Sequence, residues 1–327
     1  TRFSLRPVHH VLQDIDSVHF YVQAIEEARS SGSPVARREF AALARDGGER
    51  DLLALHAAYN FVAGGKKSIF LQDGNSLIIK PEDLIRILRH LKESFPEVER
   101  ITSYARSHTI ARISDENLVL MADAGLNRIH IGLESGSDLV LRRVKKGVDK
   151  KTHVVAGQKV RRAGIELSEY FIPGLGGRDL SRENALESAD ALNRINPDFI
   201  RLRTLALPAG VPLTEEFMNG SFQKMGEVET ASELLLFLES LTGITSRVRS
   251  DHVLNLFQEV DGNLPEDKEQ ITRPVKEFLS LAPSEQVVFC IGRRTHRFSR
   301  LEDLKNPLLR KNVETLCEEL GATIDTM

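Results

Sequence analysis

The stretch Arg128–Asp138, RIHIGLESGSD, decides how the rest of this sequence is interpreted. Apolar residues alternate with smaller or polar ones over Ile129–Leu133, and the run stops at the carboxylate of Glu134. Alternation is typical of a β-strand, and the glycine and serines of Ser135–Asp138 are typical of a turn. The stretch therefore predicts a buried strand whose C-terminal end carries a carboxylate and two hydroxyl groups.

Four other apolar runs have the same character, and helical patterns separate them at regular intervals. At Gly125 and Gly164, glycine falls where a helix ends and the chain turns into a strand. Alternating strands and helices predict an α/β fold with a parallel sheet, either a doubly wound sheet or a full or partial barrel. The predicted strands are Ser68–Leu71, Ile101–Tyr104, Arg128–Leu133, Ile165–Ile172 and Phe199–Leu207.

Helical patterns surround these strands. A helix is predicted over Pro7–Ser30, and the region 34–65 has the pattern of a helical insert. After Pro208–Pro212 the chain looks mainly helical, with one short strand at Ile244–Val248 and a helix over Asp251–Val260. We therefore expect a core domain over residues 1–213 and a mainly helical C-terminal extension over residues 214–327.

The composition argues against several classes of protein. Lysine and arginine number 44 and aspartate and glutamate 47, so the net charge of −3 gives no indication of a nucleic-acid partner. No apolar run approaches the roughly 20 residues of a membrane helix, so no membrane partner is expected. Two cysteines are too few for a disulfide framework, and the sequence TRFSLRPVHH has no apolar signal core. A cytoplasmic location is predicted.

Polar and glycine-rich loops follow all five predicted strands. Ligands of parallel α/β proteins bind at the carboxyl ends of the strands. Carboxylates, amides, hydroxyls and glycines at such an edge suit a zwitterionic, nucleoside-like ligand. Any one of these loops is also what joins a strand to a helix, but five at the same edge indicate a site. The loops are Gln72–Ser76, Ser103–Arg106, Glu134–Ser137, Pro173–Gly177 and Pro208–Gly210.

Four motifs then identify a family. HIGLESGSDLVL followed by VKKG resembles the fourth-strand region of radical S-adenosylmethionine (SAM) enzymes, in the branch of the methylthiotransferase, Elongator-type and oxygen-independent coproporphyrinogen oxidase proteins. FLQDGNSLI, FIPGLGG and RLRTLALPAGVPL resemble three further motifs of that superfamily, in the same order. The resemblance covers about residues 1–213. It implies a partial (β/α)6 TIM-type barrel whose first strand is missing from this sequence.

The resemblance also implies where the methionine part of SAM lies. Asp73, Gly74 and Asn75 would hold the ammonium group, although Asp-Gly-Asn departs from the Gly-Gly-Glu motif of the family. Ser103 would bind the methionine carboxylate. A strand serine that bonds to its own neighbour is the alternative for Ser103.

The nucleoside part of SAM is implied to lie at the later strands. By the same resemblance, Glu134 would accept hydrogen bonds from the ribose hydroxyls, with Ser135 beside it. Gly174 and Leu175 would lie along the adenine, and the backbone of Leu205 would lie opposite.

The central motif of the family is not found in this sequence. Its chemistry needs a [4Fe–4S] cluster held by three thiolates, usually in a CxxxCxxC motif, and an electron donor such as a flavodoxin or ferredoxin. Cys290 and Cys317 cannot supply three thiolates. We expect the cluster ligands upstream of Thr1 and a chain that is inactive as given. The competing interpretation is a non-catalytic nucleoside-binding or scaffold protein on a degenerate barrel.

The substrate is not identified by the sequence, and three residues are candidates for contact with it. Tyr170 and Arg201 lie on predicted strands, where alternation decides which of them face a ligand. Outward-facing ones would only pair with helix residues. His252 lies in a polar cluster with Ser250, Asp251 and Asn255, as a proton donor or a substrate anchor. The alternatives for His252 are a helix cap or a surface residue.

Overall fold

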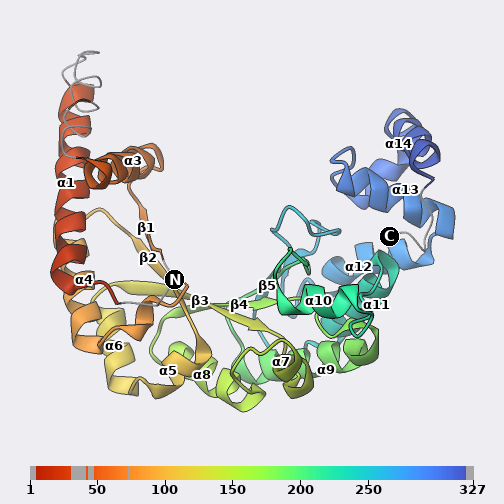
Figure 1. Cartoon of the computed structure of the whole chain (residues 1–327), viewed down its shortest axis with the longest axis horizontal. Coiled ribbons are helices and arrows are strands. Elements are labelled where there is room, and N and C mark those ends of the chain that lie inside the picture. Colours follow the sequence, from red (N-terminus) through yellow and green to blue (C-terminus); the bar gives the residue numbers. More distant parts are fainter. Residues whose placement is uncertain (1–4, 31–41, 43–47, 73, 322–327) are drawn as a thin grey trace. The chain divides into compact units, whose positions relative to one another are not determined.

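The computed structural model describes residues 5–30, 42, 48–72 and 74–321, and these form a mixed α/β fold (Figure 1). The strand order is β1-β2-β3-β4-β5-β6-β7. Strand β1 pairs parallel with β2, β4 with β5 and β5 with β6, whereas β6 and β7 are antiparallel. The predicted α/β class is confirmed, and the mostly parallel sheet agrees with a partial barrel. The strands are β1 (Ser68–Leu71), β2 (Arg100–Ala105), β3 (Leu126–Glu134), β4 (Glu166–Phe171), β5 (Phe199–Leu202), β6 (Arg247–Arg249) and β7 (Asp261–Asn263).

The chain forms two compact units, which we describe separately. The first unit comprises Thr1–His130 and Lys159–Glu166, and the second comprises Ile131–Gln158 and Leu167–Met327. The boundary thus passes within β3, β4 and the helix α8 (Lys150–Arg162).

In the first unit, helix α1 (Val8–Ser30) lies beside α3 (Glu49–Ala63) and also contacts α4 (Pro81–Ser94) (Figure 1). The predicted insert 34–65 therefore contains a helix, and its residues 34–41 and 43–47 lie outside the described part. Ser114 caps α6 (Asp115–Asp123) by accepting a hydrogen bond from the Asn117 amide at 3.2 Å, as its place before an acidic first turn predicts. The unit also contains η1 (Ser76–Ile78) and α5 (Ser107–Arg112).

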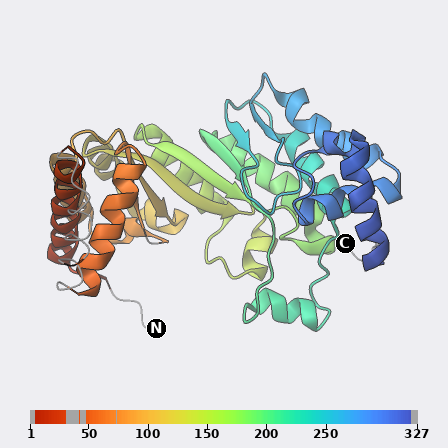
Figure 2. The same ribbon diagram turned by 90° about the horizontal axis from the view of Figure 1, so that it is seen from above.

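In the second unit, α11 (Glu227–Ser240) packs against α9 (Gly177–Ile195) and α12 (Lys268–Ser280). Figure 2 shows the C-terminal helices α13 (Pro283–Arg294) and α14 (Pro307–Leu320) next to each other, in blue. The remaining elements are α7 (Asp138–Arg143), α10 (Pro212–Met218) and η2 (Leu301–Lys305). None of the helices in the described ranges has the length and apolar composition of a membrane span.

One predicted helix is wrong. Asp251–Val260 is an irregular segment. Two of its backbone carbonyls accept hydrogen bonds from the distant side chain of Arg293, those of Asn255 at 3.0 Å and Leu256 at 2.9 Å. A carbonyl bound in this way does not need the amide four residues later, so the segment is held without helical hydrogen bonds.

Two strand predictions also need adjustment. Strand β5 ends at Leu202, shorter than the predicted Phe199–Leu207. The region 214–327 is mainly helical but also contributes β6, close to the strand predicted at Ile244–Val248, and β7, which the sequence pattern did not indicate.

Candidate functional site

Glu134 is the last residue of β3 and has an unusual backbone conformation. Its φ of 63° lies in the left-handed region, which non-glycine residues rarely adopt. The carboxylate pairs with the ammonium group of Lys146, and 32% of the Glu134 side chain remains exposed. A Cβ atom at Gly132 would lie 3.0 Å from Glu134 Oε1 and 3.2 Å from Lys146 Nζ. Glycine at position 132 therefore leaves the space in which this ion pair forms.

The turn after Glu134 is fixed by its own hydroxyl groups. Ser135 is fully buried and its Oγ accepts from the Ser137 amide at 3.0 Å. Ser137 in turn caps α7 by accepting from the Val140 amide at 3.3 Å. The Gly136 amide donates to Ser188 Oγ at 2.7 Å on the neighbouring helix α9. The Ser135 hydroxyl thus holds the turn, and its place near the ribose stays a prediction.

The loop after β4 is held by a hydrogen bond to a buried carboxylate, that of Glu233. Gly174 has a φ of 83°, and its amide donates to Glu233 Oε1 at 2.9 Å. Asn184 Nδ2 donates to the same oxygen at 2.7 Å. Burial raises the pKa of the Glu233 carboxyl. Sequence reasoning missed Glu233 and Asn184, since both lie in amphipathic helices where a polar residue is usually exposed.

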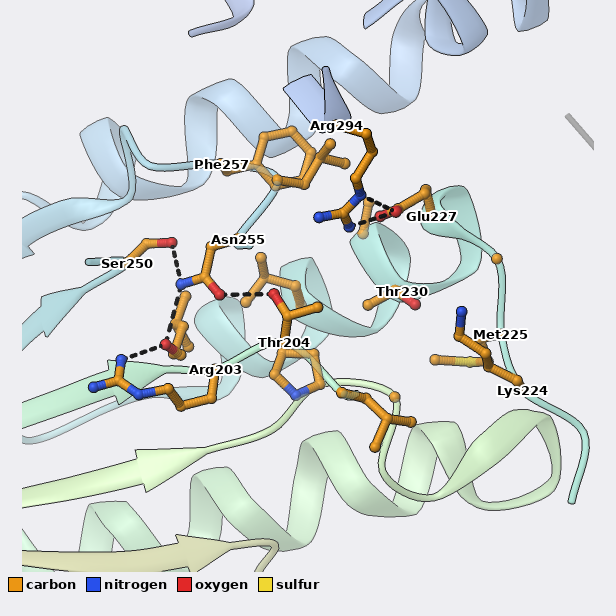
Figure 3. Close-up of a pocket in the computed structure, with 18 residues that line it drawn as sticks. Arg203, Thr204, Lys224, Met225, Glu227, Thr230, Ser250, Asn255, Phe257 and Arg294 are labelled. Carbon is orange, nitrogen blue, oxygen red and sulfur yellow. Dashed lines mark hydrogen bonds and ion pairs between the residues drawn. The ribbon is translucent and has the colours of Figure 1, made fainter. Parts of the chain in front are cut away.

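Gly174 and Leu205 line the same pocket, beyond the C-terminal end of β5 (Figure 3). The pocket is also lined by residues of two later segments, which are Lys224–Glu227, Thr230, Ala231 and Leu234 in the first and Ser250 and Asn255–Phe257 in the second. The Leu175 side chain belongs instead to an apolar cluster, which contains Val140, Leu213 and Phe222 and against which Leu205 also packs. Of the three predicted adenine contacts, the structure thus brings Gly174 and Leu205 together at the pocket.

A hydrogen-bond chain crosses this pocket (Figure 3). Asn255 Oδ1 accepts from Thr204 Oγ1 at 2.9 Å, and its Nδ2 donates to Ser250 Oγ at 2.9 Å and to the Leu202 carbonyl at 3.0 Å. On the opposite wall, Arg294 pairs with Glu227 at the start of α11. The predicted polar cluster at Ser250–Asn255 is therefore real, and Asn255 ties it to β5.

Tyr170, Arg201 and Arg203 lie together at the ends of β4 and β5. Arg201 Nη1 is 3.2 Å from Asp251 Oδ2, and Arg203 Nη1 is 3.0 Å from Asp251 Oδ1. The Arg203 guanidinium also lies over the Tyr170 ring, 4.3 Å from its centroid. One aspartate therefore bridges two arginines, and a stacked tyrosine fixes one of them.

His252, the third candidate, follows Asp251 and is half-buried. Its carbonyl accepts from the Asn255 amide at 2.9 Å, and its Nδ1 is buried with no hydrogen-bond partner in the described part of the chain. The helix-cap alternative does not hold, because no helix begins here.

The predicted methionine-binding residues lie in the first unit. Asn75 Nδ2 donates to Thr109 Oγ1 at 3.0 Å, and Asn75 Oδ1 accepts from the Arg106 amide at 3.0 Å, which ties the loop to the start of α5. Ser103 is buried and its Oγ donates to the Tyr104 carbonyl at 3.1 Å, which is the alternative foreseen for a strand serine. Gly74 lies in a turn, and Asp73 falls outside the described residues.

Two buried titratable residues near Lys146 were not singled out as site residues by the sequence. Glu169 on β4 is fully buried, and neither of its carboxylate oxygens has a hydrogen-bond partner of ordinary geometry among the described residues. Burial raises its pKa well above the ordinary value, and the charge of Lys146 opposes this only in part. Burial and the charge of Lys146 lower the pKa of His153 to about 3.

The residues present do not fit an iron–sulfur cluster. Cys290 is buried in α13 and Cys317 is half-buried in α14, and burial raises the pKa of both thiols, which disfavours the thiolate that binds iron. Within the described ranges, no group of three histidine, cysteine, aspartate or glutamate side chains is arranged to hold a metal ion.

Part of the chain is similar to known proteins. Two curated relatives are the tRNA uridine(34) acetyltransferases of Methanocaldococcus infernus and Methanocaldococcus jannaschii. The first is 22% identical over 171 residues, 49% of this chain and 32% of the relative, and the second is 21% identical over 174 residues, 48% and 31%. The matched region thus spans about a third of the length of these relatives.

Similar solved structures include the archaeal Elp3 of Methanocaldococcus infernus with residues 1–46 deleted, with a TM-score of 0.47, 17% identity and coverage of 61% of this chain and 53% of that one. Coproporphyrinogen III oxidase (HemN) from Escherichia coli has a TM-score of 0.41, 12% identity and coverage of 98% and 75%. Residues 46–189 match the model of the radical SAM superfamily. These residues of the chain thus match the radical SAM superfamily, in agreement with the resemblance of the sequence motifs.

Proposed function

We propose that this chain is the SAM-binding part of a radical SAM enzyme, and that Glu134 accepts the hydrogen bonds of the ribose hydroxyls. The observation that carries the proposal is the position of Glu134 at the end of β3, within the segment 46–189 that matches the superfamily. Among the residues that the structure describes, the carboxylate pairs with one cation, Lys146, and 32% of the Glu134 side chain is exposed and open to a ligand. An ionised carboxylate that accepts two hydroxyl hydrogen bonds is a strong anchor for a ribose.

The remaining contacts of a nucleoside also fit the second unit. Gly174 has no side chain, so a flat base can approach its backbone closely, and Leu205 lines the same pocket. The pocket combines apolar surface from Met225 and Phe257 with polar groups from Thr204 and Asn255. Such a lining is typical of sites for small, partly apolar ligands.

The residues of this chain do not fit the iron–sulfur cofactor that the family needs. In radical SAM enzymes a reduced [4Fe–4S] cluster cleaves SAM, but the two thiols of this chain do not fit that cluster. We propose that the cluster ligands and the electron donor, such as a ferredoxin or flavodoxin, are supplied from outside these 327 residues, and that the chain alone binds SAM without cleaving it. The cysteine content also suits the second candidate, a nucleoside-binding protein without catalysis. Iron analysis of the product of the intact reading frame separates the two.

Isothermal titration calorimetry with SAM tests the role of Glu134. Glu134→Gln keeps the size of the side chain and removes its charge, and we expect SAM affinity to fall about tenfold or more, since hydrogen bonds to charged groups contribute about 1.5–3 kcal/mol. Glu216→Gln is the matched control, because Glu216 also pairs with a cation, Arg143, and is 31% exposed. The proposal fails if the unaltered chain does not bind SAM, or if both variants bind it equally well.

A further inference from the structure

Four arginines share one region at the ends of β5 and β6. In the parallel pairing of these strands, Arg201 is the register partner of Arg249, and Phe199 is the partner of Arg247. Tyr170 on β4 is the partner of Arg201 on the other side. Because register partners point to the same face of a sheet, Tyr170, Arg201 and Arg249 form one row across three strands. Arg203 extends the group two residues beyond Arg201.

This row lies on the face opposite the apolar core of the second unit. Ile200 and Val248, which alternate with the arginines along β5 and β6, are fully buried. The side chains of Arg201 and Arg203 remain 17% and 23% exposed. The arginines are therefore held in place by their surroundings but are still accessible from solvent.

The group has more positive than negative charge. Asp251 pairs with Arg201 and Arg203, and Asp261 pairs with Arg247 at 2.7 Å and lies 3.4 Å from Arg249. Four guanidinium groups thus share two carboxylates, in a chain whose net charge is −3. Like charges at directly opposed strand positions, as at Arg201 and Arg249, are destabilising. The surplus positive charge therefore has a cost that a bound anion would remove.

Three hydrogen-bond donors on the same face lack acceptors within the described part of the chain. Arg201 Nε is buried without a hydrogen-bond partner, and the same holds for Arg249 Nε and for the hydroxyl of Ser168 on β4. Ser168 is the register partner of Phe199 and lies two residues before Tyr170, so it shares the face of the arginine row. Leaving a buried donor without an acceptor costs about 1–3 kcal/mol. These three groups need an acceptor, which the oxygens of a bound oxyanion would supply.

We propose that Arg201, Arg203 and Arg249 bind an oxyanion group, a carboxylate or a phosphate, of the substrate. The proposal rests on the proposed function only in identifying the molecule that carries this group as the substrate. Guanidinium groups donate paired hydrogen bonds that match the oxygens of both anions. Asp251 already occupies part of this donor set, so it limits the affinity of the site for an external anion.

The test is isothermal titration calorimetry of the chain with inorganic phosphate and, separately, with succinate. Arg201→Gln is expected to weaken binding of the preferred anion about tenfold, since hydrogen bonds between charged groups are among the strong ones. Arg178→Gln is the control, because Arg178 is an exposed arginine paired with Glu229 at 2.8 Å on a different element. If one of the two anions, phosphate or succinate, binds more tightly, this shows whether the substrate group is a phosphate or a carboxylate. Binding of neither anion, or binding that Arg201→Gln leaves unchanged, overturns the proposal.

A second variant tests whether weaker anion binding in Arg201→Gln could come from a folding defect. Asp251→Asn removes the competing carboxylate and is expected to tighten anion binding severalfold, an effect that a general loss of structure cannot produce. Unchanged or weaker binding in Asp251→Asn contradicts the proposal.

SAM and the anion are expected to bind at the same time, because Arg201 and Arg249 are not among the residues that line the pocket assigned to the adenine, although Arg203 is. Competition between them would assign the arginines to the methionine carboxylate of SAM and overturn the proposal. Loss of SAM binding with anion binding retained would refute only the proposed function.

Discussion

Glu134 and Lys146 form an ion pair in the space left by the missing side chain of Gly132. Gly132→Ala is therefore expected to displace the carboxylate and weaken SAM binding about tenfold, which calorimetry measures. The atoms nearest to the new Cβ are the ends of two flexible side chains, so the melting temperature is expected to change by no more than a few degrees.

Gly136→Ala is the contrasting variant. Its Cβ would clash with the backbone at Glu187 of α9, which cannot move aside as a side chain does. We expect it to lower the unfolding free energy by about 1–3 kcal/mol. If instead Gly132→Ala unfolds the chain, or leaves SAM affinity intact, the ion pair is not what positions the ribose.

Glu169 predicts that the unfolding free energy falls as the pH rises above 4.5. Burial raises the pKa of its carboxyl above the ordinary value of 4.5, so above pH 4.5 the folded chain keeps a proton that the unfolded chain releases. The unfolding free energy should then fall by up to about 1.4 kcal/mol per pH unit until the folded pKa is reached. Glu169→Gln removes this slope.

Urea unfolding at pH 4, 6 and 8 measures the effect of Glu169→Gln. The variant is expected to match the unaltered chain at pH 4 and to exceed its stability at pH 8. A variant that is less stable at pH 8 would mean that Glu169 is ionised and stabilised as a carboxylate in the folded chain.

His153 predicts the opposite slope on the acid side. Its pKa is lowered from 6.5 to about 3, so between these values the unfolded chain takes up a proton that the folded chain does not. The contribution of His153 to the unfolding free energy is fully present above pH 6.5 and is lost as the pH falls toward 3. His153→Gln should flatten this part of the pH profile of unfolding. An unchanged acid slope in the variant would show that other groups cause it.

Glu233 holds the glycine-rich loop after β4 by accepting a hydrogen bond from the Gly174 amide. Glu233→Ala removes the acceptor of the Gly174 amide and one of the two acceptors of Asn184 Nδ2, which keeps the Ile172 carbonyl. A buried donor left without an acceptor costs about 1–3 kcal/mol. Glu233→Gln keeps one oxygen for these bonds and should be the less destabilised variant. Thermal unfolding of the two variants gives the comparison, and equal melting temperatures would argue against the hydrogen bonds as the source of the effect.

Local patterns predicted the positions of the main strands because apolar alternation and glycine at helix ends depend only on neighbouring residues. Glu134 at the end of β3 was predicted for the same reason. Lys146 and Glu233 were missed, since each reaches its partner through tertiary packing. The helix prediction over Asp251–Val260 is wrong for a similar reason, because Arg293, distant in sequence, donates hydrogen bonds to the carbonyls of Asn255 and Leu256. The roles of the predicted ligand-binding residues remain predictions.

The most direct test of the account is a crystal structure of this chain with SAM. We predict that the ribose hydroxyls lie within hydrogen-bond distance of the Glu134 carboxylate, and that the adenine lies against Gly174 and Leu205. Density for SAM at any other place, or a ribose that does not contact Glu134, would contradict the central claim.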